Sequence, residues 1–441
     1  LKLDAISESL NSGAMLKAKL ILNGLHPAEI ARLLESSPPR QRRLIWEMLD
    51  HSYDGEVLLE VGEEVRNNLM ESMDEQSLLA ATKGLDVDDL ADLLDELPET
   101  VVKQALKGMD YQYRTRLEGV MNYNEDTAGG LMNTDTITIR PDVTLDVVLK
   151  YLRLKKEIPQ NTDNIIVVDR YNHYLGTLSV TTLLCADPEK TVSESMNNDY
   201  ISISADSLAN EVVNIFEDRD LVSAPVVDQN NILLGRITID DVVDVIREES
   251  EHTVLNMAGL TDEEDIFAPV LPSTRRRAIW LGINLITALI ASGVISLFQN
   301  TIEQVVALAV LMPIVASMGG IAGSQTLTLV IRGIALGNVS STNSRSLLFK
   351  EISIGLLNSF LWATVIGVLS SYWFDNYLIG IVIGIAMIAN LGFAALSGVL
   401  VPIMLKRIGV DPALGGGVIL TTITDVIGFF SFLALGTIFL L

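Results

Sequence analysis

The chain has 441 residues, a single cysteine and a formal charge of −25 at pH 7. Its length exceeds one ordinary domain, so two or three units are expected. Of its 56 acids and 31 bases, residues 275–441 hold five and eight, which leaves a formal charge of −28 on residues 1–274. This acidity argues against nucleic acid as a partner, because Lys and Arg drive phosphate binding. The lone Cys185 excludes a disulfide framework and a Cys-rich zinc site.

Residues 1–125 are predicted to be all-helical, with an acidic surface. The stretches "EIARLLESSP" (29–38) and "DLADLLDELP" (89–98) repeat 60 residues apart. Each has apolar residues at helical spacing and ends at a proline, which is typical of a helix and its stop. A helical superhelix is the natural interpretation, and a plain scaffold is the alternative to a functional role.

Residues 131–250 contain a second repeat. Met132 corresponds to Met196, 64 residues on, and Gly176 corresponds to Gly235, 59 residues on. Each copy predicts a short strand, a helix, a Val-rich strand, a turn, a second strand and a helix. The pattern resembles a tandem pair of cystathionine-β-synthase (CBS) modules, here 126–190 and 191–247. That fold implies adenine-nucleotide or ion sensing rather than catalysis, and the sequence leaves open whether ATP occupies the modules.

The remainder of the chain is predicted to lie in a membrane. Five apolar runs follow a predicted linker helix (248–274, the plug helix), and each run is long enough to cross a ~30 Å bilayer core as a helix. The eight bases of residues 275–441 all fall on one side of these runs, which the positive-inside rule assigns to the cytoplasm. The acidic part is therefore expected in the cytoplasm. The runs are 278–302, 304–331, 352–374, 376–405 and 412–441.

Small residues crowd the second run, in "MGGIAGS" (318–324). One interpretation is close helix packing through small side chains. The other is a helix opened at Pro313 and the glycines, so that Gly319 and Gly320 line a water-filled path.

Asp425 lies in the middle of the last run, in "TTITDVIGFF" (421–430). A charge at that depth costs ~2.5–3.5 kcal/mol, and no base lies within a run to neutralise it. Asp425 could cap a broken helix or stay protonated, but a cation site fits better. Thr421 lies one helical turn earlier on the same face, and such oxygen ligands suit Mg²⁺ or Ca²⁺. Since a divalent ion carries two charges, a homodimer pairing two such carboxylates is expected.

The order of these parts resembles the MgtE family of magnesium channels. The resemblance covers essentially the whole chain and is most specific in "YNEDTAGGLM" (123–132) and "GVDPALGGGVILTTITDVIGFF" (409–430). It implies a multidomain protein with an all-α superhelical N-terminal domain, an α/β CBS pair and a membrane domain of five transmembrane helices. It also implies a homodimeric, Mg²⁺-selective channel in the bacterial inner membrane, closed by cytoplasmic Mg²⁺.

The resemblance also implies site residues. Asp425 would be the selectivity acid, with Thr421 beside it, and Asp411 a second ligand near the cytoplasmic end. The regulatory Mg²⁺ ligands would be the carbonyl of Gly130 and seven carboxylates. Those carboxylates belong to Asp88, Asp92, Glu217, Asp220, Asp241, Asp244 and Glu249. The pairs Asp88/Asp92 and Glu217/Asp220 are each expected to share a helix face.

This sequence departs from the family pattern at several positions. Ile321 stands where members usually have Asn, and His252, Thr253 and Asn210 stand where acids are expected. We therefore expect this protein either to bind fewer regulatory Mg²⁺ ions or to respond at another Mg²⁺ concentration. The alternative function is a membrane-anchored CBS nucleotide sensor without transport. An enzyme is not expected, because the four histidines are scattered and no nucleophile motif accompanies them.

Overall fold

The computed structural model describes residues 15–155, 158–260, 265–340 and 342–441. By their internal contacts these residues form two compact units. The first runs up to Ser250 and includes a short later segment that ends at Ala268. The second takes in the stretch from Glu251 and then Pro269–Leu441. The start of the predicted helical region and part of the predicted linker lie outside the described residues.

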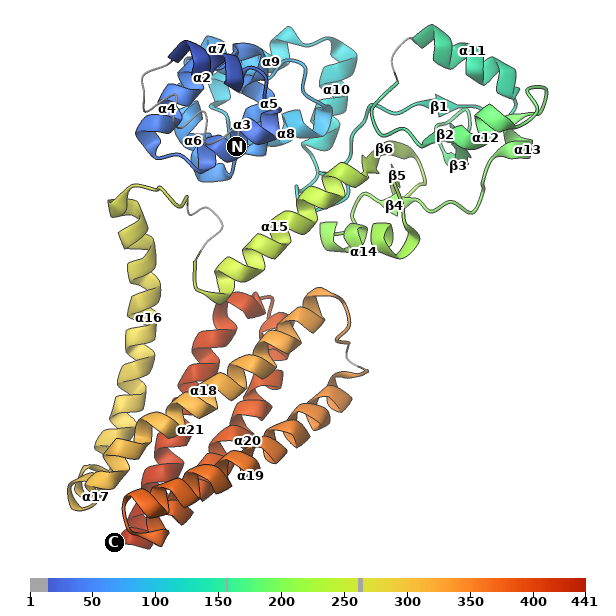
Figure 1. The fold of residues 1–441 in the computed structure, drawn as a ribbon. Helices are drawn as coiled ribbons and strands as arrows, with labels where there is room; N and C mark the ends of the chain where they lie inside the picture. Colours follow the sequence, from blue (N-terminus) through green and yellow to red (C-terminus); the bar gives the residue numbers. More distant parts are fainter. Residues whose placement is uncertain (1–14, 156–157, 261–264, 341) are drawn as a thin grey trace. The chain divides into compact units, whose positions relative to one another are not determined.

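The N-terminal part of the first unit is all-helical, as predicted (Figure 1). Prolines open α3 and α4 at the first helical position, where the missing N–H removes no helical hydrogen bond. The two sequence repeats form α3 and α8, and both bury leucines at equivalent places. The helices are α2 (Met15–Leu22), α3 (Pro27–Glu35), α4 (Pro39–Met48), η1 (His51–Tyr53), α5 (Asp54–Glu60), α6 (Glu63–Met70), α7 (Glu75–Ala81), α8 (Val87–Glu96), α9 (Glu99–Gly108) and α10 (Tyr111–Val120).

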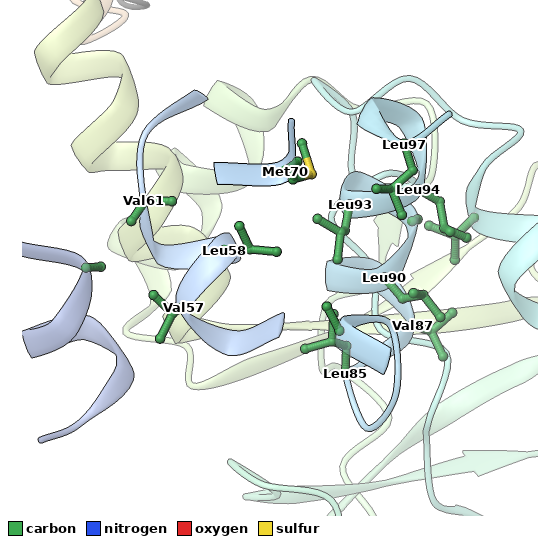
Figure 2. Packing of buried hydrophobic residues seen from close by; sticks show 14 of the residues in the cluster. Val57, Leu58, Val61, Met70, Leu85, Val87, Leu90, Leu93, Leu94 and Leu97 are labelled. Carbon is green, nitrogen blue, oxygen red and sulfur yellow. The ribbon is translucent and has the colours of Figure 1, made fainter. Parts of the chain in front are cut away.

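The apolar face of α8 anchors it in the core. Leu90, Leu93 and Leu94 are at most 2% exposed and share one helix face with Val87 (Figure 2). The acids of α8 lie on the opposite face of the helix. Figure 2 shows Leu93 on the side of α8 that faces Leu58 of α5 and Met70 of α6. The same core continues into the second module, so α8 is packed in one body with it.

The two modules have the same strand topology, as the repeat predicts. In each, a short parallel strand precedes an antiparallel pair, in the sheet orders β1-β2-β3 and β4-β5-β6. The elements are β1 (Thr138–Ile139), α11 (Leu145–Lys155), β2 (Asn164–Val168), β3 (Tyr174–Ser179), α12 (Val180–Cys185), α13 (Val192–Ser195), β4 (Ile203–Ser204), α14 (Ala209–Arg219), β5 (Ser223–Val227), β6 (Leu233–Thr238) and α15 (Ile239–Met257).

The leading segment of each module pairs with the other module. Asn133 bridges to β6, and Asn197 bridges to β3. A Cβ on Gly235 would lie 2.7 Å from the carbonyl oxygen of Asn133, and one on Gly176 would lie 2.5 Å from that of Asn197. The repeated glycine is therefore required because a crossing backbone passes directly over it.

The predicted linker, 248–274, is not one helix. α15 begins at Ile239, inside the second module, and ends at Met257, while the next helix begins at Val270. Gly259 takes a left-handed conformation, and the N–H of Leu260 donates to the carbonyl of Leu255. This closes α15, because glycine adopts that conformation without a steric penalty.

The second unit has five helices long and apolar enough to span a membrane, which confirms the predicted number for the described residues. α18 is continuous with Pro313 inside it, so the interpretation of an opened helix is wrong. α20 packs against α18, α19 and α21 and is the most buried of the five. The helices are α16 (Val270–Ser296), the short α17 (Gln299–Gln304), α18 (Val306–Ala335), α19 (Ser344–Trp373), α20 (Tyr377–Arg407) and α21 (Pro412–Leu440).

Candidate functional site

A groove of about 790 Å³ lies between α18 and α21. It brings Gly320, predicted to line the pore, together with Thr421 and Asp425, which are predicted to share a face of the last helix. Its wall is rich in hydroxyl, amide and small side chains, and Asp425 is its one carboxylate. The lining residues are Ala316, Ser317, Gly320, Ile321, Ser324, Gln325, Thr328, Thr421 and Asp425.

Asp425 and Thr421 are presented to the groove by an unbroken helix. α21 runs through both residues, so Asp425 does not cap a broken helix, and that alternative is wrong. The Thr421 hydroxyl donates to the carbonyls of Gly417 and Val418, at 3.0 and 3.1 Å, which leaves its oxygen free to accept or to ligate. Within the described ranges no side chain bonds the Asp425 carboxylate. The groove thus offers a carboxylate and a hydroxyl oxygen to a hard cation.

Gly319 does not line the groove, so this part of the pore-lining prediction is wrong. A Cβ at Gly319 would lie 2.3 Å from Nδ2 of Asn390, whereas one at Gly320 would meet nothing within 4 Å. Adjacent residues point in different directions on a helix, so one glycine serves packing and the other faces the groove. Gly319 therefore fits the other interpretation of the small residues, close helix packing.

Asp411 lies at the N-terminus of α21 and outside the groove lining. Its Oδ1 accepts from the backbone N–H of Ala413 at 2.9 Å, which caps the helix. Its Oδ2 accepts from the Asn256 amide at 2.8 Å, from the end of α15. The His252 ring lies within hydrogen-bond reach of the same amide. Asp411 therefore joins the linker segment to the start of α21.

The first unit contains an acidic group of which the sequence pattern predicts only one member. Asp86, Asp88 and Asp89 each place a carboxylate oxygen within 4.8 Å of the others. Asp88 was predicted, whereas Asp86 and Asp89 were missed. The run "DVDDLAD" (86–92) carries the signal, because a helix N-cap and first turn bring such neighbours together.

Burial, together with the charges of Asp241 and Asp89, raises the pKa of Asp88 to about 8. Burial also raises the pKa of Asp241 to about 7, although its Oδ2 accepts from the backbone and hydroxyl of Thr238. Asp241 thus also caps α15. Asp88 and Asp241 stand 153 residues apart in the sequence, and the fold makes each sense the other's charge.

The remaining predicted regulatory residues near α8 vary in their surroundings. The side chain of Asp92 is exposed, yet partial burial and the charges of Glu125 and Asp89 raise its pKa to about 7. Burial raises the pKa of Asp244 too, opposed by the nearby Arg247. Gly130 is buried, and a Cβ there would lie 2.5 Å from the carbonyl oxygen of Asn124, so only glycine fits at this position.

Glu217, Asp220 and Glu249 are exposed. α14 ends at Arg219, and Asp220 caps it in a left-handed conformation. The prediction that Glu217 and Asp220 share a helix face is therefore wrong. The helix stops one residue earlier than the spacing implied.

The acidic group fits a hard divalent cation. Its potential ligands are all carboxylate oxygens, which Mg²⁺ prefers. Oδ1 of Asp88 is buried and has no hydrogen-bond partner in the described part of the chain. The raised pKa of Asp88 and its unpartnered Oδ1 indicate that the described residues do not compensate the negative charge of this carboxylate when it is ionised.

Three protein-family models match successive parts of the chain. The family model for "Divalent cation transporter" (MgtE) matches residues 312–435, the "MgtE intracellular N domain" matches 25–126, and the "CBS domain" matches 128–189 and 192–248. The "Magnesium transporter MgtE" of Thermus thermophilus is 29% identical, over 99% of this chain and 98% of its own. The protein of the same name from Bacillus subtilis is 28% identical, over 98% and 96%.

A solved structure matches the soluble part. The crystal structure of the cytosolic domain of the Mg²⁺ channel MgtE in complex with ATP is 28% identical, with a TM-score of 0.50. The match covers 55% of this chain and 99% of that one. Three family models in the expected order, relatives aligned over nearly the whole length and five apolar helices agree. The chain belongs to the MgtE family of divalent cation transporters.

Proposed function

We propose that the protein is a Mg²⁺-selective channel of the bacterial inner membrane, with its acidic domains in the cytoplasm. The observation that carries this proposal is the groove between α18 and α21, where Asp425 and Thr421 lie side by side on one helix face. The relatives aligned over nearly the whole chain are named magnesium transporters, which supports Mg²⁺ as the substrate.

The groove would attract a cation without holding it tightly. Mg²⁺ gives up its water reluctantly, so a wide site with few oxygen ligands suits the hydrated ion. Weak binding also lets the ion leave, which conduction requires. A homodimer would bring two Asp425 carboxylates to one divalent ion. The membrane potential would drive entry with about 4.6 kcal/mol per 100 mV for two charges.

The acidic group of the first unit would make transport sensitive to cytoplasmic Mg²⁺. Burial is the main cause of the raised pKa values of Asp88 and Asp241, and the charges of Asp241 and Asp89 on Asp88, and of Asp89 on Asp241, add to it, so these carboxylates repel one another when ionised. A bound divalent cation supplies the missing positive charge and so favours the packed arrangement of α8 and α15. Several such sites, each with higher affinity for the packed state, would shift the equilibrium together.

ATP is a further proposed ligand of the modules, because the solved structure of the MgtE cytosolic domain is a complex with ATP. The same observation favours the second candidate function, a membrane-anchored nucleotide sensor without transport. The two functions differ in one measurable property, the flux of Mg²⁺.

The test is Mg²⁺ uptake by liposomes that contain purified full-length protein. Asp425→Asn is expected to abolish most of the uptake, because it removes the charge that attracts the ion. Asp375→Asn is the matched control, because Asp375 is an exposed acid between α19 and α20, and its left-handed conformation suits Asn equally well. Equal uptake by wild type and Asp425→Asn would refute the proposed role of the groove, and no uptake by wild type would favour the sensor.

A further inference from the structure

Asn390 is a buried polar residue, and lining the groove does not explain why a polar side chain is buried at this position. It lies near the middle of α20, its side chain is fully buried, and it does not belong to the groove lining. Its Nδ2 donates to the carbonyl oxygen of Val315 on α18 at 2.7 Å. Its Oδ1 is buried without a hydrogen-bond partner among the residues that the structure describes. An apolar side chain would avoid that cost, so the amide has a role besides filling space.

Asn390 contacts α18 and α21 at once, at the places where both helices carry glycine. A Cβ at Gly319 would lie 2.3 Å from Nδ2 of Asn390, and a Cβ at Gly428 would lie 2.8 Å from the same atom. Real Cβ atoms do not come so close. The side chain of Asn390 therefore fixes how near these two helices approach α20.

These contacts lie directly beside the groove. Val315 and Gly319 share one face of α18, while Gly320 and Ser324 share the face that lines the groove. On α21, Gly428 follows Asp425 by three residues. Asn390 thus holds both walls of the groove from the packed side.

The hydrogen bond fixes α18 next to its proline. Pro313 has no N–H, so the helix lacks the internal hydrogen bond to the carbonyl of Ala309, in the turn that precedes the proline. The bond from Asn390 to the Val315 carbonyl fixes the turn that follows the proline against α20. A leucine of similar size would fill the space but would not set the position along the helix.

We propose that Asn390 is a positioning residue that sets the width of the groove, and with it the size of hydrated cation that the groove accepts. This proposal rests on the proposed transport function. Asn390 does not touch the ion. It acts through its contacts with Gly319, Gly428 and the Val315 carbonyl. These contacts fix the positions of α18 and α21, whose groove-facing side chains contact the ion.

The first experiment measures selectivity in liposomes. Asn390→Ala is expected to raise the ratio of Ca²⁺ to Mg²⁺ uptake several-fold. It is also expected to raise several-fold the inhibitory concentration of hexaamminecobalt(III), a rigid mimic of hydrated Mg²⁺. Ser370→Ala is the control, because Ser370 of α19 is also buried, its oxygen has no partner among the residues with described positions, and it lies outside the groove. Lower uptake by Asn390→Ala with an unchanged ratio and unchanged inhibition would overturn the proposal, since a merely structural role predicts that result.

A second pair of variants tests the spacer directly. Gly319→Ala forces α18 away from Asn390, so the uptake ratio is expected to change. Combining it with Asn390→Ala removes the clash and is expected to return the ratio toward the wild-type value. A double variant no closer to wild type than Gly319→Ala alone would contradict the spacer role.

A third measurement does not depend on transport. Spin labels at Ile321→Cys and Thr421→Cys, in a Cys185→Ser background, report the distance between the groove walls by electron paramagnetic resonance. Proteins labelled at only one of the two positions show which part of the distance distribution comes from pairs of labels on different subunits. Asn390→Ala is expected to shift the distances to longer values, and an unchanged distribution would overturn the proposal. A shift in the labelled proteins, combined with no Mg²⁺ uptake by unlabelled wild type, would refute the transport function and leave the positioning role of Asn390 intact.

Discussion

Replacing Asp88 by asparagine is expected to stabilise the packing of α8 at pH 8 when no divalent cation is present. The Asp88 side chain is 8% exposed, and its Oδ1 has no partner among the described residues. Asparagine has nearly the same shape and carries no charge. The substitution therefore removes the repulsion from Asp89 and Asp241 and the cost of burying a carboxylate.

The size of the effect follows from the pKa. It is 3.8 for an ordinary Asp and about 8 for Asp88 in the folded protein. Between these values the folded state keeps a proton that the unfolded state has lost, so stability falls as the pH rises and levels off above the folded pKa. At 1.36 kcal/mol per pKa unit the cost reaches about 6 kcal/mol. This is an upper limit, because local opening of α8 lets the carboxylate reach water without global unfolding.

The assay is hydrogen exchange of the α8 amides in full-length protein, expressed as free energies of opening at pH 5.5 and pH 8. In EDTA, wild type is expected to open more easily at pH 8 than at pH 5.5, and Asp88→Asn is expected to lose that difference. Mg²⁺ is expected to protect α8 in wild type at pH 8 and to protect it little in the variant. Glu47→Gln is the control, because it removes one exposed charge from α4.

Two results would refute this reasoning. Easier opening of α8 in Asp88→Asn than in wild type, in EDTA at pH 8, would mean that the carboxylate makes favourable contacts. Full protection of the variant by Mg²⁺ would mean that Asp88 is not a ligand.

Three further changes test contacts within one unit or the other. The ion pair of Arg42 and Asp265 spans 2.7 Å with both side chains 4% exposed, so Asp265→Ala should lower the free energy of unfolding by about 3–5 kcal/mol; an unchanged urea midpoint would contradict this. Asp411→Ala removes the cap of α21 and should cost about 1 kcal/mol, seen as faster amide exchange confined to the first turn of that helix. Gly235→Ala places a Cβ 2.7 Å from a crossing carbonyl oxygen and should cost about 1–3 kcal/mol in thermal unfolding. Gly108→Ala, where a Cβ meets nothing within 4 Å, is its control.

Much of the architecture is a local property of the sequence. The five apolar runs became five helices because bilayer-length hydropathy is set by consecutive residues. The module repeat predicted the strands because alternation and turn residues act over short distances. Asp425 and Thr421 share a face of α21 because both lie on one unbroken helix.

Residues that meet across the chain could not be predicted in this way. Hydropathy does not distinguish Gly319 from Gly320, and the position of Asn390 decides which one faces the groove. Likewise, nothing near Asp411 in the sequence indicates that its carboxylate binds Asn256, 155 residues away.

The sequence by itself determined the parts, their order and the acid placed within the membrane. The tertiary structure decided which carboxylates share their charge and which small residues are spacers. Local patterns depend on neighbours along the chain, whereas the pKa of Asp88 and the packing of Gly319 depend on residues brought close only by folding.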